Sequence, residues 1–194
     1  MYYSLVHSHL IYGIQIRSSG SSTNITNLFK LQKKAIRLVH SVPYNSHTES
    51  LFKSSNLLPL PILVDFFRLQ FMHQFTHGHL PISFLDTWTS NADRLALAGF
   101  GRANYNLRNS EDLYTPYCRT AALERHPLFL FPRLWTEFNE LSIKFIRDKT
   151  EFNFKLKKHM ISKLESNYRC TRLFCPHCSR VPMPNPNPDD VDSE

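Results

Sequence analysis

The chain has 194 residues, and its net charge of +7 comes from 23 Lys and Arg against 16 Asp and Glu. A hydrophobic fraction of 42% and an aromatic fraction of 13% exclude a wholly disordered chain. Five Gly against 12 Pro argue against a Gly-rich nucleotide-binding α/β fold and against a turn-rich β-barrel. Because no apolar run approaches the ~20 residues that span a bilayer and no secretory signal is evident, we expect no membrane partner and an intracellular location, nuclear or cytoplasmic.

The charges are unevenly distributed along the chain. The first acidic residue is Glu49, whereas residues 181–194 hold four acids and no base. Without that tail the net charge is +11, from 23 basic and 12 acidic residues. A basic body favours a polyanionic partner, most often nucleic acid, although a basic surface without any partner has the same composition.

The predicted elements begin with a helix over 1–17 and a loop over 18–22. A second helix is predicted over 24–41, with Asn24 as its cap. Its apolar residues recur at helical spacing, namely Ile25, Leu28, Phe29, Ala35, Ile36 and Val39, with Leu31 and Leu38 widening the stripe. The opposite side carries Lys30, Lys33, Lys34 and Arg37. Because no carboxylate interrupts this basic side, it could follow a phosphate backbone, although it could also be an ordinary solvated face.

A short helical turn is predicted near residues 47–53, and Pro61 suits the first turn of the next helix. That helix, over 62–77, is apolar on nearly every side, which predicts a central and buried position, and Gly78 ends it. His73 and His77 lie one turn apart, a spacing that a metal pair can use. Since no acidic ligand accompanies them, we interpret them as packing residues.

The following segment is harder to interpret. We predict a short helix over 81–88 and an irregular stretch over 89–110. In that stretch three arginines alternate with Phe100 and Tyr105, namely Arg94, Arg102 and Arg108. Arginines interleaved with aromatics can hold single-stranded nucleic acid by charge and stacking, or can form a loop whose aromatics enter the core.

The last part of the body becomes regular again. We predict an extended or turn segment over 128–131, a core-facing helix through Leu134, Trp135, Phe138 and Leu141, and a second basic amphipathic helix over 151–167. In that last helix the apolar residues Phe152, Leu156, Met160 and Leu164 are flanked by Lys155, Lys157, Lys158 and Lys163. Of these lysines, we expect Lys155, Lys157 and Lys158 to contact nucleic acid. By composition, the tail over 181–194 is extended and disordered.

Three cysteines, Cys170, Cys175 and Cys178, fall within nine residues. Cys175 and Cys178 are separated by two residues, a spacing that is typical of tetrahedral zinc sites, so we expect a structural zinc ion there. The fourth ligand would be His159, Cys118 or a group of a partner molecule. The alternative is a set of free thiols in a mobile tail.

Catalytic motifs are absent from the sequence. It contains no Gly-x-Ser-x-Gly, no phosphate-binding glycine loop and no His-Glu-x-x-His. Asp189 and Asp190 lie in a Pro- and Asn-rich stretch, without apolar strands to hold them as a two-metal site. We therefore assign no catalytic residue.

Several blocks of the sequence resemble, in order, the region after the catalytic palm in reverse transcriptases of non-LTR retrotransposons of the jockey and LINE groups. These blocks are YYSLVHSHLIYGI at 2–14, LQKKAIR at 31–37, HTESLF at 47–52, NYNLR at 104–108, YTPYCRT at 114–120, LW at 134–135, FKLKK at 154–158 and YRC at 168–170. The resemblance covers roughly residues 1–178. Residues 135–139 depart from the pattern, which suggests sequence drift.

The resemblance implies a mainly α, irregular helical bundle. It divides into a thumb-like region over 1–88, an Arg-bearing connector over 89–117, a helical region with the cysteine cluster over 118–180 and the acidic tail over 181–194. It further implies that Lys30, Lys33, Lys34 and Arg37 face the backbone of an RNA or DNA duplex, that Arg108 belongs to the connector, and that the cysteines belong to a terminal cluster that helps to bind nucleic acid. The sequence lacks the palm and its Ala-Asp-Asp box, so Mg²⁺ and polymerisation would belong only to a full-length RNA-directed DNA polymerase, whose palm would be a partner of this region.

Two other interpretations stay open. The first is a small zinc-dependent nucleic-acid-binding protein that functions by itself. The second is a non-functional translated relic of a transposable element, in which the apolar central helix lacks the domain on which it should pack.

Overall fold

The computed structural model describes residues 2–20, 22–44, 46, 48–84, 86–97 and 111–164. Within these residues the chain is mainly α-helical, as predicted, and its β-structure is limited to a single bridge between Ser90 and Leu113. No helix in this part of the chain combines the length and the hydropathy needed to cross a bilayer. The acidic tail predicted to be disordered lies outside the described residues.

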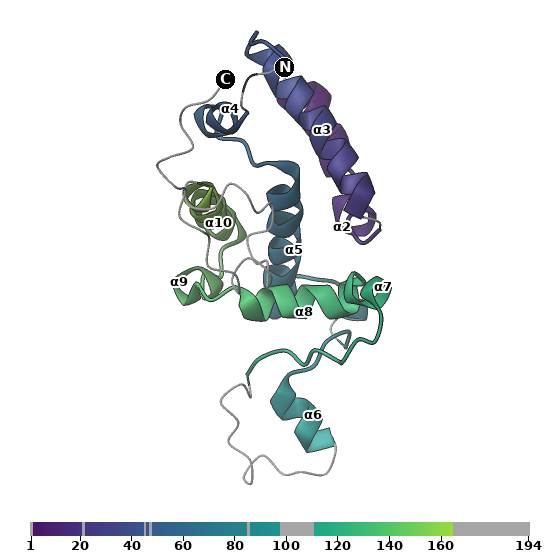
Figure 1. Cartoon of the computed structure of the whole chain (residues 1–194). Helices are drawn as coiled ribbons and strands as arrows, with labels where there is room; N and C mark the ends of the chain where they lie inside the picture. Colours follow the sequence, from purple (N-terminus) through teal and green to yellow (C-terminus); the bar gives the residue numbers. More distant parts are fainter. Residues whose placement is uncertain are drawn as a thin grey trace, which may run out of the picture.

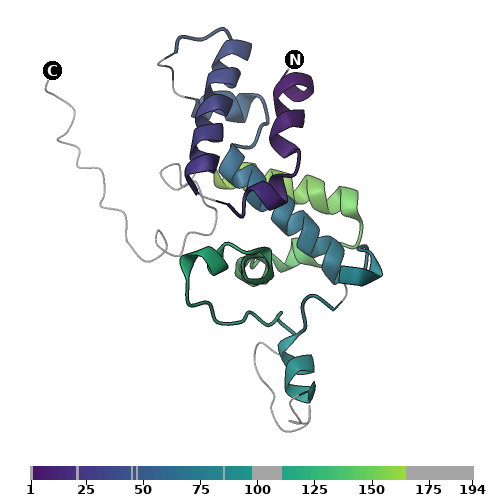
Figure 2. The same ribbon diagram turned by 90° about the vertical axis from the view of Figure 1, so that its right-hand side faces the viewer.

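Helix α5 (Leu60–Thr76) occupies the centre of the molecule, as its all-round apolar sequence predicted. Helices α3 (Ser22–Val39), α8 (Pro127–Glu137) and α10 (Lys149–Lys163) all pack against it, and Figures 1 and 2 show them approaching from different sides. The main core therefore joins residues from both halves of the chain, among them Leu63, Leu69, Met72, Phe138 and Phe152.

The first turn of α5 is fixed by a buried side chain of α3. The backbone N–H of Leu60, one of the donors that a helix start leaves without an internal acceptor, donates to Gln32 Oε1 at 2.7 Å. Gln32 Nε2 donates to the Leu58 carbonyl at 3.1 Å and to the Tyr2 hydroxyl at 2.8 Å. Gln32, which is 1% exposed, thus connects the N-terminal segment, α3 and α5.

Three successive helices end in the same way. After α3, after α4 (Glu49–Ser54) and after α5, one residue adopts a left-handed conformation; these residues are Ser41, Asn56 and Gly78. The N–H of the residue that follows each of them bonds to the carbonyl five positions earlier, which satisfies a carbonyl that the helix end leaves free. Gly78 and α4 were both predicted, and both predictions are confirmed.

The N-terminal segment differs from the single helix predicted over 1–17. A π-helix, η1 (Tyr3–His7), continues into α1 (Ser8–Ile11), and α2 (Ile14–Arg17) follows after a break. The break consists of Tyr12, which is extended at ψ 114°, and Gly13, which is left-handed at φ 58°. The prediction was wrong because the spacing of apolar residues does not reveal a helix break made by one glycine. The turn directs Ile14 into the core, where it is 5% exposed.

Helix α3 begins at Ser22, so Asn24 lies inside the helix and does not cap it. Its core-facing side contains Ile36, which is fully buried, and the half-buried Ile25, Leu28 and Phe29. The predicted stripe was wrong at Val39, which is 44% exposed, and at both residues predicted to widen it, since Leu31 and Leu38 are 57% and 79% exposed.

The segment predicted as extended over 128–131 is helical and belongs to α8. Pro127 occupies the first turn, where its missing N–H is not needed. Pro132 lies inside the helix and offers no N–H to the Leu128 carbonyl. The indole N–H of Trp88 donates to that carbonyl at 3.0 Å instead, so the interior proline leaves no unpaired acceptor at this position.

The core-facing helix predicted through Leu141 is shorter than expected. Helix α8 ends at Glu137, and α9 (Leu141–Lys144) is a separate short helix. Leu134, Trp135 and Phe138 are buried as predicted, whereas Leu141 is 61% exposed.

Between α5 and α8 the predicted helix over 81–88 is reduced to the 3-10 helix η2 (Ile82–Phe84). The stretch predicted to be irregular begins with a helix, α6 (Asn91–Leu97), which projects away from the body (Figures 1 and 2). Its base is closed by two backbone hydrogen bonds, from Asn91 to Asp112 at 2.9 Å and from Tyr114 to Thr89 at 2.8 Å. Residues 98–110, including Arg102 and Arg108, lie outside the described residues.

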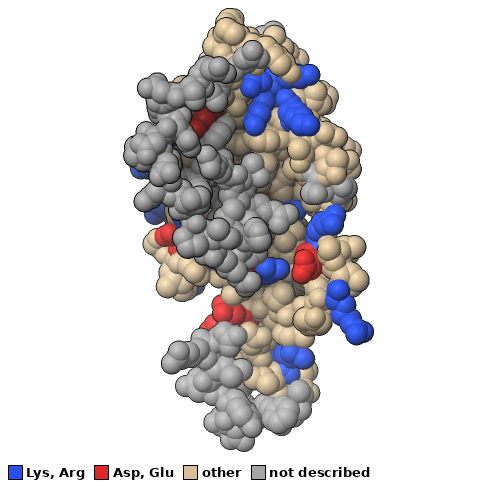
Figure 3. All heavy atoms as spheres, in the orientation of Figure 1, with Lys and Arg blue, Asp and Glu red and all other residues tan. Residues whose placement is uncertain are grey.

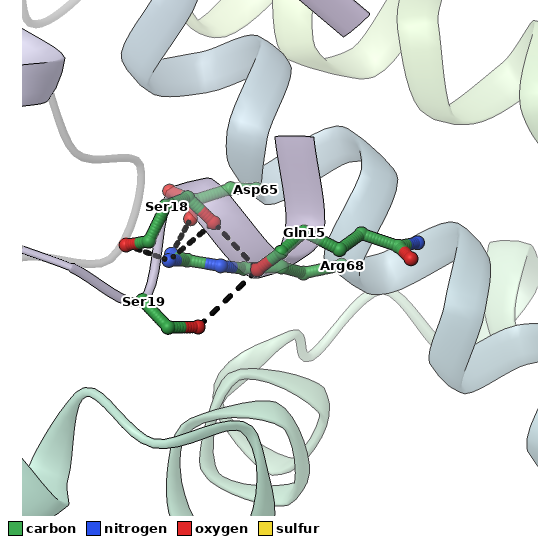
Figure 4. A network of polar contacts seen from close by, with 5 residues as sticks. All are labelled: Gln15, Ser18, Ser19, Asp65 and Arg68. Carbon is green, nitrogen blue, oxygen red and sulfur yellow. Dashed lines mark hydrogen bonds and ion pairs between the residues drawn. The ribbon is translucent and has the colours of Figure 1, made fainter. Parts of the chain in front are cut away.

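A buried polar network joins α2 to α5 (Figure 4). Arg68 Nη1 lies 2.9 Å from Asp65 Oδ1, and Arg68 Nη2 donates to both the carbonyl and the hydroxyl of Ser18 at 3.1 Å. The hydroxyls of Ser18 and Ser19 in turn donate to the Gln15 carbonyl. The network fixes the turn after α2 against the central helix.

Helix α10 confirms the second amphipathic helix, with Phe152, Leu156 and Met160 fully buried. Asp148 caps it by accepting from the backbone N–H of Glu151 at 2.8 Å. The Phe152 ring stacks on the ring of His73 from α5, with centroids 3.9 Å apart. His73 Nε2 donates to the Ile146 carbonyl at 2.6 Å, so the histidine packs between the two helices as predicted.

We expect the protein to lose stability as the pH falls below about 6.5, the ordinary pKa of histidine. Burial lowers the pKa of His73, and His77 and His79 lower it further, whereas the bond to Ile146 and the nearby Asp148 oppose this. The unfolded chain therefore binds a proton at higher pH than the folded chain, and the stability present above pH 6.5 declines as the pH falls toward the folded pKa.

Urea unfolding at about pH 7.5 and about pH 5.5 checks this expectation, because most carboxylates stay ionised in that window. The midpoint should be lower at the acidic pH, and the difference should shrink in the variant His73→Gln. An unchanged difference in that variant would assign the effect to His7 and His159, whose pKa values burial also lowers.

Candidate nucleic-acid interface

Helix α3 carries four basic residues that are not buried: Lys30, Lys33, Lys34 and Arg37, which we call the α3 basic face. Figure 3 shows Lys and Arg side chains gathered over the upper part of this helix. The opposite side of α3 is held on the molecule by Gln32 and Ile36, which are 1% and 0% exposed. The sequence prediction that these four residues share one side of a helix is consistent with this arrangement.

Within the described residues, none of the four forms an ion pair with an acidic side chain. By contrast, basic residues on other helices do pair with carboxylates one turn away, for example Lys53 with Glu49 at 3.5 Å and Arg133 with Glu137 at 3.0 Å. The difference follows from the sequence, since residues 1–48 contain no acid. The positive potential of the α3 basic face is therefore not compensated locally.

The four cations differ in their surroundings. Lys30 and Lys34 are exposed, whereas Lys33 and Arg37 are half-buried. Lys33 Nζ lies 4.3 Å from the centroid of the Phe29 ring, and burial and the nearby Arg37 lower the pKa of Lys33. Arg37 Nε donates to the Ser46 carbonyl at 2.9 Å, which holds the guanidinium beside the turn that follows α3.

Sequence reasoning missed Tyr44, which belongs to this surface. Its ring centroid lies 5.9 Å from Lys34 Nζ and 5.6 Å from the guanidinium carbon of Arg37, and the residue is 69% exposed. A signal was present in the sequence, since Tyr44 follows Pro43 directly after the basic helix. Its position over the cations depends on how the chain turns at Ser41, which spacing does not reveal.

The basic residues of α10 form a separate surface. Figure 1 shows α3 and α10 on opposite sides of α5. Lys155 is paired with Glu151 at 2.7 Å, and Lys163 lies 4.0 Å from Glu140. Lys157 and Lys158 are the two predicted contacts of α10 that have no acidic partner among the described residues. The structure does not bring the two Lys-rich helices onto one face.

The predicted zinc ligands are described only in part. Cys170, Cys175 and Cys178 lie outside the described residues, and Cys118 is half-buried before α7 (Ala121–Glu124). His159 lies on α10 with its ring edge on Phe138 and its Nε2 3.7 Å from Glu140 Oε1. The described residues contain no group of three or more His, Cys, Asp or Glu placed to hold a metal ion. A zinc site at the cysteines stays a prediction.

Comparison with known proteins gave no similarity. No family model, no curated protein and no solved structure matches the chain.

Proposed function

We propose that the chain binds nucleic acid through the α3 basic face, mainly by contacts to phosphates and with little dependence on base sequence. The observation that carries this proposal is the set of four cations on one side of an anchored helix, with no acidic partner in the described part of the chain. Lys30 and Arg37 are seven residues apart, which is about 10 Å along a helix axis and close to the rise of three base pairs.

We further propose that this surface belongs to a thumb-like region of a reverse transcriptase related to those of non-LTR retrotransposons. The block LQKKAIR at 31–37, which resembles that family, supplies both parts of the proposed surface. Gln32 and Ile36 anchor the helix by burial, whereas Lys34 is exposed and Lys33 and Arg37 are half-buried. In this proposal the bound ligand is the duplex of template and primer, and polymerisation requires a palm.

We expect the variant with Lys30, Lys33, Lys34 and Arg37 all replaced by Gln to bind an RNA–DNA hybrid at least tenfold more weakly at low salt. The slope of log Kd against log salt should fall by up to about 3.6, because each lost phosphate contact removes about 0.9. Fluorescence anisotropy with a labelled hybrid measures both quantities.

A matched control removes four charges on other helices, by replacing Lys155, Lys157, Lys158 and Arg133 with Gln. This variant should keep most of the affinity and the slope, because it leaves the α3 basic face intact. Equal losses in the two variants would show that net charge alone drives binding, and a flat salt response of the unmodified chain would contradict phosphate binding altogether.

A further inference from the structure

The ring of Tyr44 is an exposed aromatic surface beside the α3 basic face. The residue is 69% exposed, so the ring does not belong to the core. Its two neighbouring cations, Lys34 and Arg37, lie 5.9 Å and 5.6 Å from the ring centroid, near the outer limit of a cation–π contact. By contrast, the guanidinium carbon of Arg94 lies 3.7 Å from the centroid of Tyr114 and covers that ring. Among the described residues, Tyr44 therefore has two cations near its ring, and no side chain covers the ring at the close range seen at Tyr114.

The position of Tyr44 is set by hydrogen bonds on both sides of it. Before it, the left-handed Ser41 ends α3, with the N–H of Val42 bonded to the Arg37 carbonyl at 3.1 Å. After it, the N–H of Ser46 bonds to the Pro43 carbonyl at 3.0 Å, and the Ser46 carbonyl accepts from Arg37 Nε at 2.9 Å. The turn that carries the ring and the helix that carries the cations are thus connected through Arg37.

We propose that Tyr44 stacks on an unpaired base, and that the α3 basic face therefore prefers a nucleic acid with a single-stranded extension over a blunt duplex. An aromatic ring next to cations is what a flexible strand requires, because a base can stack on the ring while its phosphate contacts Lys34 or Arg37. A base inside a continuous duplex has both faces covered by its neighbours and is not available to the ring. This inference rests on the proposed nucleic-acid binding and specifies the ligand.

The experiment compares two labelled RNA–DNA hybrids that differ only in an unpaired extension of about five nucleotides. The unmodified chain should bind the extended hybrid at least about fivefold more tightly, the equivalent of one stacked base. Tyr44→Ala should weaken binding of the extended hybrid more than binding of the blunt hybrid and so remove this preference, whereas Tyr44→Phe should retain the preference. Tyr117, which is 88% exposed outside the basic face, supplies the control Tyr117→Ala, which should behave like the unmodified chain.

A fluorescent base analogue in the extension gives a direct readout, since its emission should be quenched by the unmodified chain and not by Tyr44→Ala. Equal affinity for the two hybrids, or a preference that survives in Tyr44→Ala, would overturn the stacking role and leave the proposed function in place. Equal losses on both hybrids in Tyr44→Ala would also overturn it. Failure of the unmodified chain to bind either hybrid would contradict the proposed function itself.

Discussion

Replacement of Arg68 by Ala is expected to lower the free energy of unfolding by about 3–5 kcal/mol. The side chains of Arg68 and Asp65 are 11% and 7% exposed, so the variant buries the Asp65 carboxylate without its cation. The Ser18 carbonyl and hydroxyl also lose their donor, which loosens the turn between α2 and α3. Urea unfolding followed by circular dichroism measures the change.

The surface pair Arg133–Glu137 provides the control for this prediction. Its atoms are 3.0 Å apart, as close as those of the buried pair, but the side chains are 44% and 35% exposed. Arg133→Ala should cost less than about 1 kcal/mol, because water solvates the remaining carboxylate. Similar costs for the two variants would contradict the role assigned to burial. The double variant Asp65→Asn with Arg68→Met should recover part of the loss, since it leaves no buried charge.

Replacement of Phe152 by Ala is expected to be about as damaging, with a loss of about 3–5 kcal/mol. Phe152 is fully buried, and its ring stacks on His73 and lies 6.4 Å from the ring of Trp135. The variant would open a cavity where α5, α8 and α10 meet. Thermal or urea unfolding at neutral pH checks this expectation.

Phe154, two residues along the same helix, is the matched control. It is 71% exposed, so Phe154→Ala removes the same atoms from the same helix without opening a cavity. Its effect should stay within about 0.5 kcal/mol. A comparable loss in both variants would contradict the role assigned to the burial of Phe152, because Ala is the better helix former at both positions.

The elements that sequence analysis predicted correctly are those whose own residues contain the signal. Helix α5 is apolar all round, α10 repeats apolar residues every fourth position, and Gly78 supplies the left-handed residue that ends a helix. The elements it missed depend on partners distant in sequence. Helix α8 contains Pro132, and the helix is compatible with that proline because Trp88, 40 residues before Leu128, supplies the missing donor. No local pattern could indicate that bond.

The candidate site shows the same division. The placement of Lys30, Lys33, Lys34 and Arg37 on one side follows from helical periodicity. The absence of acidic residues before Glu49 can be read directly from the sequence. Gln32, which anchors this helix, was not predicted, because its three hydrogen bonds reach Tyr2, Leu58 and Leu60. Tyr44 was missed because the turn at Ser41 places it over the helix. The contacts assigned to Arg102, Arg108 and the cysteines stay predictions.

The hydrogen bond from Trp88 to the Leu128 carbonyl makes the residue at position 88 and the proline at position 132 depend on each other. Any substitution at Pro132 restores a backbone N–H, which would compete with the indole for the same carbonyl. Loss of the indole while the proline remains would leave that partly buried carbonyl without its donor. In descendants of this sequence, positions 88 and 132 should therefore change together, as a correlated pair that neither local composition nor hydrophobic pattern would identify.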